Sequence, residues 1–230
     1  MRKHVCIALL FTFLAGGVVF AGDVARFVNL GFSEDSNVFM FGQYGVRSED
    51  TRAYAEIYTV DVAKNRFVKG GTASKVFDIA IEPGQDGRGA LFELLHTVKP
   101  LVEKYRIRHL ATGRVVYLLI DGKEPKERLE FRDFYRGDSY VLSLNQQKFG
   151  EGKNVKSSFH INLSVTDKEG KTRAYTLGLP DYTRDGVMSY RIKQVLFSPD
   201  ERGLVCVVEK HLWEPEGKSI RYMVETVRLD

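Results

Sequence analysis

Alternating apolar and polar positions cover most of this chain, and they predict β-strands. The segment "FHINLSVTD" (159–167) places apolar side chains at every second position, as half-buried strands do, and "NVFMFGQYGV" (37–46) has a β-rich apolar composition. Further segments with alternating or β-branched composition are 26–32, 54–62, 114–120, 128–134, 139–147, 172–179, 189–198, 204–213 and 220–229. Polar turn residues separate these runs. The pattern therefore predicts a mainly β protein built from antiparallel meanders.

Two of the connections predict hairpins. The segment "VTDKEGKTRAYTL" (165–177) has a polar, glycine-containing turn between two alternating runs. The segment "VVYLLIDGKEPKERLEF" (115–131) has the same form with a longer loop. We expect the strands that flank each loop to pair with each other.

One segment departs from the β pattern and predicts an amphipathic helix near residues 88–108. Its apolar residues recur at helical spacing. They are Leu91, Leu94, Leu95, Val98, Leu101, Val102 and Tyr105. Pro100 lies inside the segment, where it should kink the helix or begin a second short helix from its first turn. We expect this helix to cover a sheet face or the end of a barrel.

Similar units occur at the two ends of the chain, at about 26–68 and 191–229. Each reads strand, Phe-Ser-x-Asp turn, strand, charged loop, strand. In this interpretation Phe32 and Phe197 anchor the strand ends in the core. The side chains of the following Ser and Asp bond the turn's backbone N–H groups. These turn residues are Ser33, Asp35, Ser198 and Asp200.

The turn motif resembles the "FSPDG" turn of TolB-like and WD40-type propeller blades. The final glycine of that motif is replaced by Ser36 and Glu201. A closed propeller needs about four or more four-stranded blades, and this chain has two recognisable units. The sequence therefore favours an incomplete propeller, a sandwich or a barrel. The two end units could pack side by side and close the sheet, but the sequence does not tell whether they do.

The first 21 residues have the pattern of a secretory signal peptide. Arg2 and Lys3 precede an apolar stretch, and Val19-Phe20-Ala21 provides a cleavage site after Ala21. The interpretation leaves one exported β-rich domain over residues 22–230. No later apolar run predicts a membrane-spanning helix. The pattern does not distinguish the periplasm from the extracellular space.

Composition adds two constraints on the exported domain. Removing Arg2 and Lys3 from the 34 basic residues leaves 32 against 30 acidic ones, so no general attraction to nucleic acid is expected. Cleavage also removes Cys6 and leaves Cys206 alone, which predicts no internal disulfide. Cys206 itself lies in an apolar run and is interpreted as a buried hydrophobic residue.

The order of the blocks "GFSEDSNVFMFGQYGV", "YAEIYTVDVAKNRFV", "VLFSPDERGLVCVVE" and "RYMVET" resembles a bacterial family of predicted secreted proteins (domain of unknown function 2259). The block from Gly31 to Val68 is the most specific part. The resemblance implies export and one conserved domain, and it implies no activity or catalytic residue.

A search for chemistry finds no nucleotide-binding, zinc-protease or nucleophile-elbow motif. The histidines His96, His109, His160 and His211 form no local metal-ligand spacing, so no metal or cofactor is expected. The remaining polar candidates are His160 on a predicted strand and the loop residues Asp181, Tyr182 and Asp185. These residues could bind a glycan or act as acid and base in a hydrolase, although Pro-Asp and Asp-Gly also occur in plain turns.

Arg136, Gly137 and Asp138 form the tripeptide found in integrin ligands, followed by Ser139. The same residues also form an ordinary hairpin turn. The sequence favours a non-enzymatic binding, scaffold or envelope-associated protein, with an envelope protein or a glycan as partner. A carboxylate-dependent periplasmic hydrolase and a surface adhesin are the alternatives.

Overall fold

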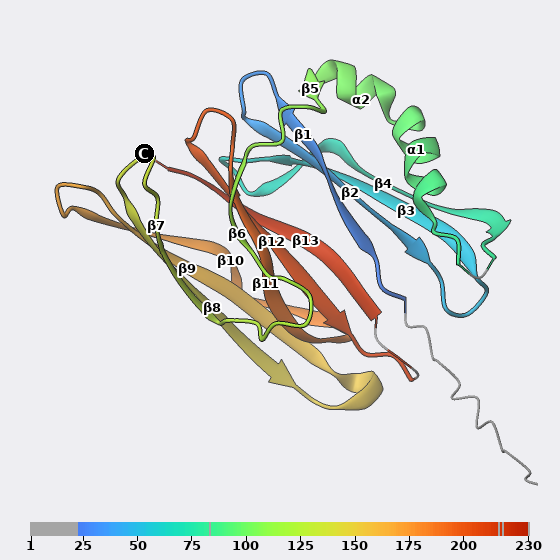
Figure 1. Cartoon of the computed structure of the whole chain (residues 1–230). Coiled ribbons are helices and arrows are strands. Elements are labelled where there is room, and N and C mark those ends of the chain that lie inside the picture. Colours follow the sequence, from blue (N-terminus) through green and yellow to red (C-terminus); the bar gives the residue numbers. More distant parts are fainter. Residues whose placement is uncertain (1–22, 83, 216, 218, 230) are drawn as a thin grey trace, which may run out of the picture.

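The computed structural model describes residues 23–82, 84–215, 217 and 219–229, which form three antiparallel sheets and two α-helices (Figure 1). The predicted signal peptide, residues 1–21, lies outside the described residues. The mainly β, antiparallel prediction is confirmed. In the part of the chain described here, all three sheets are open, and they stack face to face in the manner of a multilayered sandwich.

The N-sheet has the strand order β4-β3-β2-β1-β5. Its strands are β1 (Arg26–Ser33), β2 (Val38–Val46), β3 (Arg52–Asp61), β4 (Arg66–Ala80) and β5 (Ile107–Arg108). Helices α1 (Arg88–Thr97) and α2 (Lys99–Lys104) cover one of its faces (Figure 1). Pro100 lies in the first turn of α2, so the predicted helical segment is two helices that meet at Val98.

The central sheet has the order β13-β12-β11-β6, and the outer sheet has the order β10-β9-β8-β7. The central strands are β6 (Arg114–Leu118), β11 (Val187–Phe197), β12 (Gly203–Leu212) and β13 (Ser219–Arg228). The outer strands are β7 (Arg128–Arg132), β8 (Ser139–Phe149), β9 (Lys156–Thr166) and β10 (Thr172–Asp185), with a 3-10 turn at Gly152–Asn154. The 165–177 hairpin is confirmed as β9 and β10.

The predicted 115–131 hairpin is wrong. β6 pairs with β11, and β7 pairs with β8, so the loop between β6 and β7 joins two different sheets. The sequence pattern missed this because the residues of β11 that pair with β6 lie about eighty positions away in the chain. Alternation shows that a segment is a strand, but it does not show which strand is its neighbour.

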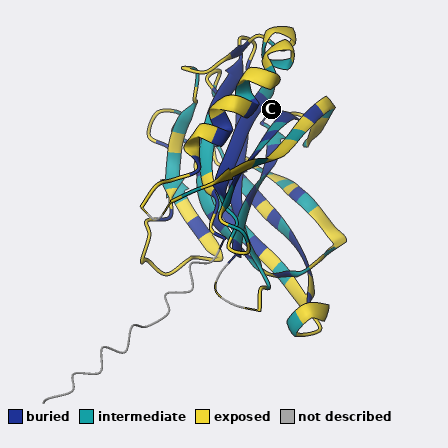
Figure 2. Ribbon diagram, turned by 90° about the vertical axis from the view of Figure 1, so that its right-hand side faces the viewer, coloured by how far each residue is buried: buried dark blue, intermediate teal, exposed yellow. Residues whose placement is uncertain are grey.

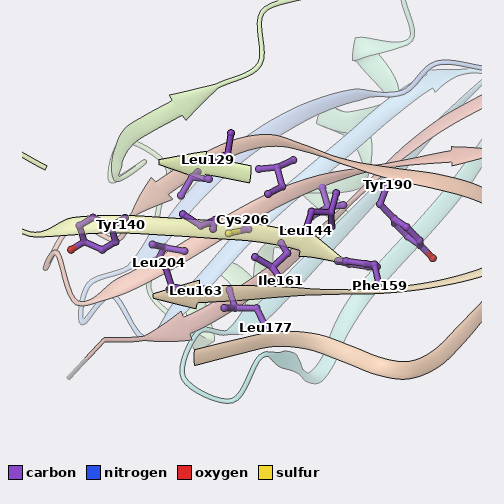
Figure 3. Packing of buried hydrophobic residues seen from close by; sticks show 14 of the residues in the cluster. Leu129, Tyr140, Leu144, Phe159, Ile161, Leu163, Leu177, Tyr190, Leu204 and Cys206 are labelled. Carbon is purple, nitrogen blue, oxygen red and sulfur yellow. The ribbon is translucent and has the colours of Figure 1, made fainter. Parts of the chain in front are cut away.

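Three apolar layers hold the sheets together. The first lies between the outer and central sheets and includes Tyr140, Phe159, Tyr190 and Cys206 (Figure 3). The second lies between the central sheet and the N-sheet, and the third between the N-sheet and the helices. The central sheet is therefore covered on both faces. This explains why β12 has the unbroken apolar run 204–208, since a strand buried on both faces needs apolar residues at successive positions.

The burial pattern agrees with this layering. The strands that lie between two apolar layers are largely buried, whereas the helices are exposed on the side that faces away from the N-sheet (Figure 2). Within the described residues, neither helix is long and apolar enough to cross a membrane.

The two Phe-Ser-x-Asp turns have matching geometry. Ser33 Oγ donates to Asp35 Oδ1 (2.6 Å), and Ser198 Oγ donates to Asp200 Oδ1 (2.5 Å). Each Ser Oγ also accepts the N–H that begins the next strand. Ser36 and Glu201, which occupy the glycine position of the blade motif, both have left-handed φ angles of 59° and 61°. The backbone conformation that favours glycine is thus kept without the glycine.

The two end units do not close a common sheet, which answers a question that the sequence left open. They belong to different sheets and face each other across the second apolar layer. The phenylalanines of the two turns are fully buried there or in the adjacent layer, at 0% exposure. The resemblance to propeller blades is therefore limited to the turn and the three-strand meander.

Two glutamines from the flanking sheets bind the backbone of the central sheet. Gln43 of β2 accepts the Tyr222 N–H (2.7 Å), and its amide lies 3.5 Å from the Tyr222 carbonyl oxygen. Gln146 of β8 accepts the Tyr190 N–H (2.8 Å) and donates to the Tyr190 carbonyl (3.3 Å). These contacts satisfy backbone groups along the sides of β13 and β11, where strand pairing ends.

Asn65, in the turn between β3 and β4, makes a third contact of this type. Its Oδ1 accepts the Thr226 N–H of β13 (2.8 Å), and its Nδ2 donates to the Glu225 carboxylate. Glu225 is only 5% exposed, and burial raises its pKa against the effect of the Asn65 hydrogen bond. The edge strand of the central sheet is therefore covered by side chains of the N-sheet, which protects it from pairing with another chain.

Candidate functional site

A cleft of about 530 Å³ opens between the N-sheet and the central sheet, and we call it the inter-sheet cleft. Residues before and within β1 form one wall, and four strands of the central sheet, with the loop after β6, form the other. Its lining residues are Val24, Ala25, Arg26, Phe27, Leu118, Asp121, Lys193, Gln194, Glu209, Ile220 and Tyr222. A pocket with mostly apolar walls and a few converging polar groups is the usual form of a small-molecule site.

The apolar walls of the cleft are partly open to solvent. Val24 is 44% exposed and Leu118 is 54% exposed, and both line the opening. Beside them, Ile120 is 63% exposed on the loop after β6. Large apolar side chains that gather around a cleft are a recurring feature of binding surfaces.

Glu209 is the buried polar group of the cleft. It is 6% exposed, and its carboxylate accepts from the Tyr222 hydroxyl (3.5 Å) and contacts His211 Nε2 (3.2 Å). Burial works to raise the pKa of Glu209, but the His211 hydrogen bond and the nearby positive charges outweigh it and lower the pKa. Burial and the Glu209 charge raise the pKa of Tyr222. At neutral pH the cleft therefore holds a charged carboxylate beside a neutral phenol.

Lys193 lies between two carboxylates of very different exposure. Its Nζ is 3.6 Å from Glu209 Oε1 and 2.6 Å from Asp121 Oδ1. The Lys193 side chain is 19% exposed, the Glu209 side chain 8% and the Asp121 side chain 90%. The hydrogen bond and charge of Lys193 lower the pKa of Asp121. Glu209 is thus a buried partner of the Lys193 ammonium group, and Asp121 is a solvent-exposed partner on a loop.

This arrangement suits binding better than covalent catalysis. Cys206, the free cysteine of the described chain, belongs to the apolar layer between the central and outer sheets (Figure 3). It does not line the inter-sheet cleft. Burial raises the pKa of its thiol, so the nucleophilic thiolate is disfavoured. Lys193 contacts the carboxylates of Glu209 and Asp121, and an ammonium group of this kind suits the binding of anions.

The residues selected from the sequence lie on the outer sheet and are only partly brought together. His160 and Asp181 line one cavity of about 380 Å³ with Glu127 and the amides of Asn145 and Gln147. This cavity is the place where the predicted glycan or hydrolase site would lie. It forms because β10 bulges between Leu179 and Arg184 and carries Asp181 over β9.

Tyr182 and Asp185 have other partners. Tyr182 is 55% exposed, and the Arg184 guanidinium lies 4.8 Å from its ring centre. Asp185 forms an ion pair with Lys156 (3.1 Å). The structure therefore does not gather the four predicted residues into one cluster.

The Arg136-Gly137-Asp138 turn is engaged within the protein. Asp138 is 8% exposed, and its carboxylate accepts from Arg136 Nε (3.1 Å) and the Tyr140 hydroxyl (3.3 Å). Arg136 also donates to the carbonyl oxygen of Glu201. Since an adhesive motif needs a free aspartate, this geometry favours the turn interpretation.

A family model described as predicted secreted protein (DUF2259) matches residues 40–228. The chain belongs to the DUF2259 family. The match runs from the third residue of β2 to the end of β13 and therefore includes Asp121, Lys193, Glu209 and the outer-sheet cavity. Comparison with curated proteins and with solved structures gives no match.

One feature of the sequence could have predicted the inter-sheet cleft of this DUF2259 protein. Glu209 and His211 are two residues apart on a strand, so their side chains share one face. Charged residues on a strand whose other positions are apolar indicate a buried ion pair or a site. Lys193 and Asp121, however, join them only through strand pairing, which no local pattern reveals.

Proposed function

We propose that the protein is an exported, non-enzymatic binding domain whose inter-sheet cleft takes an amphipathic anion. The ligand has an apolar body and a carboxylate or phosphate head group. The observation that carries the proposal is the position of Lys193 between buried Glu209 and exposed Asp121. Membership of a family described as predicted secreted proteins supports export, and we include signal cleavage after Ala21 in the proposal.

The head group would replace Asp121. An ion pair with a solvent-exposed partner contributes little to stability, so separating Lys193 from Asp121 costs little. A ligand anion inside the cleft would be partly desolvated and would form a stronger, charge-assisted bond with the same ammonium. Glu209 keeps Lys193 in place while the partner is exchanged.

The body of the ligand would lie along the apolar walls. Phe27, Leu118 and Ile220 line the cleft beyond the charged groups, and the cleft volume of about 530 Å³ lies within the range of roughly 300–1,000 Å³ that is usual for ligand sites. Covering the exposed Leu118 and Val24 side chains would contribute about 25 cal/mol per Å² of apolar surface removed from water.

Calorimetric titration with dodecanoate and dodecyl phosphate tests this function. We expect both to bind, and dodecanol and dodecyltrimethylammonium to bind at least tenfold more weakly. Lys193→Met should lower the affinity for dodecanoate by about 10- to 100-fold, since a hydrogen bond to a charged group contributes about 1.5–3 kcal/mol. Asp121→Asn should raise the affinity by up to about fivefold, because the competing carboxylate is gone.

Lys156→Met is the matched control, since Lys156 also pairs with an exposed aspartate but lies on the outer sheet. It should leave dodecanoate binding unchanged. Equal binding of dodecanol, or equal losses in the two lysine variants, would refute the anion site. The N-terminal residue of the protein recovered from its producing cell tests the cleavage after Ala21.

A second candidate is glycan binding in the outer-sheet cavity. His160 and Asp181 line it together with neutral amides, which are suitable partners for sugar hydroxyl groups. A glycan array of bacterial envelope sugars, compared between the wild type and the pair His160→Ala and Asp181→Asn, tests it. Binding that both variants weaken supports this candidate, and binding that neither changes contradicts it.

A further inference from the structure

The most exposed large apolar side chains of the described chain lie in two turns. They are Leu110, between β5 and β6, and Phe134 and Tyr135, between β7 and β8, and they are 98%, 89% and 80% exposed. No other large apolar side chain among the described residues is more than 63% exposed. Single exposed apolar residues are normal on a protein surface, but several that gather at one end of a molecule indicate a contact surface.

Both turns belong to one end of the stack, which we call the turn end. It consists of the β1–β2, β7–β8, β9–β10 and β11–β12 turns and the segment that precedes β6, and it lies away from the beginning of β1 (Figure 1). Arg114 Nη2, at the start of β6, lies 2.8 Å from Asp133 Oδ2, and its guanidinium lies 5.4 Å from the ring centre of Tyr135. The Phe32 N–H, near the end of β1, donates to the Ala111 carbonyl oxygen (2.9 Å). These contacts place the two apolar turns on the same end.

The backbone of each turn keeps the apolar side chains exposed. The Ala111 N–H donates to the Arg108 carbonyl oxygen (3.0 Å), which closes the turn around Leu110. The Gly137 N–H donates to the Asp133 carbonyl oxygen (2.7 Å), which closes the turn around the two aromatic residues. The three side chains therefore project from closed turns.

Cationic side chains without an ion pair lie beside these apolar residues. Lys168 and Lys171 belong to the β9–β10 turn, and a Cβ atom at Gly137 would lie 3.7 Å from the Lys168 Cβ. Arg132 ends β7, and Arg202 lies in the β11–β12 turn. None of these four cations has an ion-pair partner in the part of the chain that the structure describes.

Most carboxylates of the turn end, in contrast, are neutralised by a cation within the protein. Those that form ion pairs are Glu34, Asp133, Asp138, Asp167, Asp200 and Glu201. Asp35 and Glu169 form none among the described residues. The charge that the turn end leaves unpaired is therefore positive, which favours a negatively charged partner.

We propose that the turn end docks on the surface of an anionic lipid membrane. Leu110, Phe134 and Tyr135 enter the interfacial layer, where a ring with a polar tip is favoured, and the unpaired lysines and arginines lie beside the lipid head groups. A protein partner suits this end less well, because the apolar side chains project from separate turns and form no groove. Docking would leave the inter-sheet cleft open, since that cleft is lined by residues at the other end of β1. The proposal does not depend on the ligand of that cleft.

Sedimentation with vesicles of equal parts phosphatidylglycerol and phosphatidylcholine tests the docking. We expect the protein to bind these vesicles, and to bind vesicles of phosphatidylcholine alone at least about tenfold more weakly. High salt should weaken binding to the anionic vesicles. Leu110→Ser and Phe134→Ser should each lower the partition coefficient at least about fivefold. Lys168→Glu combined with Lys171→Glu should lower it at least about tenfold.

Ile79→Ser and Lys153→Glu are the matched controls. Ile79 is a 63% exposed apolar residue near the end of β4, and Lys153 is an exposed lysine in the 3-10 turn. Strand register places both at the end of the stack opposite the turn end. They should leave vesicle binding unchanged. The N-terminal segment is the same in every variant, so differences between the variants report on the replaced residues.

No binding of the wild type to the anionic vesicles, or equal binding of the wild type and the two serine variants, would overturn the proposal. Analytical ultracentrifugation tests a second copy of the chain as the partner. A dimer that Phe134→Ser abolishes, without vesicle binding, would overturn the proposal in favour of self-association. Lys193→Met should bind the vesicles as the wild type does, so this test and that of the cleft ligand can fail independently.

Discussion

Replacing Gln43 with glutamate tests whether the side-chain amides between the sheets stabilise the stack. Gln43 is 1% exposed, and its amide serves two partners. Its Oε1 accepts the Tyr222 N–H, and its Nε2 donates to Glu56 Oε2 at 2.5 Å. Gln43→Glu keeps the acceptor and the shape, but it removes the donor and places a second carboxylate beside Glu56.

The size of the effect follows from two limits. Two like charges about 4 Å apart repel by roughly 4 kcal/mol at an effective dielectric constant near 20. The protein can avoid this repulsion by protonating one carboxyl group, which at pH 7 costs at most about 3.7 kcal/mol for an ordinary glutamate. We therefore expect Gln43→Glu to lose about 2–4 kcal/mol of unfolding free energy at pH 7, or roughly 5–15 °C in Tm. Near pH 4.5 a shared proton forms an O–H···O bond, and the loss should fall below about 1 kcal/mol.

Thermal unfolding followed by circular dichroism between pH 4.5 and pH 8 measures this difference. Gln146→Glu is the matched control, because Gln146 makes the same two contacts with the backbone of Tyr190. No acidic side chain shares its amide in the described part of the chain. Its loss of stability should depend little on pH. An equal loss for Gln43→Glu at both ends of the pH range, or the same pH dependence in Gln146→Glu, would refute the reasoning.

Four further substitutions test other parts of the fold by thermal or urea unfolding. Ser36→Gly should stabilise by about 0.5–1 kcal/mol, because Ser36 has a φ of 59° and the left-handed region costs other residues roughly 1–2 kcal/mol; a loss of stability would show that the turn needs the serine side chain. Gly45→Ala should cost at least about 2 kcal/mol by displacing Tyr54. Gly89→Ala is the control, because a Cβ atom at this position of α1 would meet open space. It should raise the unfolding free energy by up to about 1 kcal/mol. Equal effects at both glycines would contradict the steric explanation. Glu225→Gln should raise Tm at pH 7 and leave it unchanged below pH 4. Burial raises the pKa of folded Glu225, so ionisation above the unfolded pKa favours unfolding; a gain that persists at pH 4 would contradict the assignment.

The sequence predicted the strands well because burial on one face leaves a period of two. It predicted the two helices for the corresponding reason, and Pro100 marked the boundary between them. Phe-Ser-x-Asp turns were also predictable, since their hydrogen bonds join residues within five positions of each other. Each of these features depends on local interactions, which a single sequence records directly.

The arrangement of the sheets, the inter-sheet cleft and the outer-sheet cavity depended on contacts between distant residues. β6 was expected to pair with β7 but pairs with β11, which brings Asp121 to Lys193. Arg221 and Asp23, which form an ion pair, are separated by nearly the whole domain. Among the predicted site residues, His160 and Asp181 share a cavity only because β10 bulges. Local patterns contain no information about such pairings.

The segment from the end of α2 to β6, which we call the linker, covers only part of the interface between the two end units. The inter-sheet cleft lies in the part that the linker leaves uncovered. The linker pairs with β1 through β5, at Phe32 and Ser33, and then crosses to β11 through β6. It passes close to both turns at Gly113, where a Cβ atom would lie 2.2 Å from the Phe197 carbonyl oxygen and 3.1 Å from the Phe32 ring. Near the turns the linker therefore fills the space between the sheets. At the other end of β1, Arg26 and Phe27 line the cleft instead. Because the same short linker closes one end and leaves the other open, the two end units form both a tight core and an open cleft in a single interface.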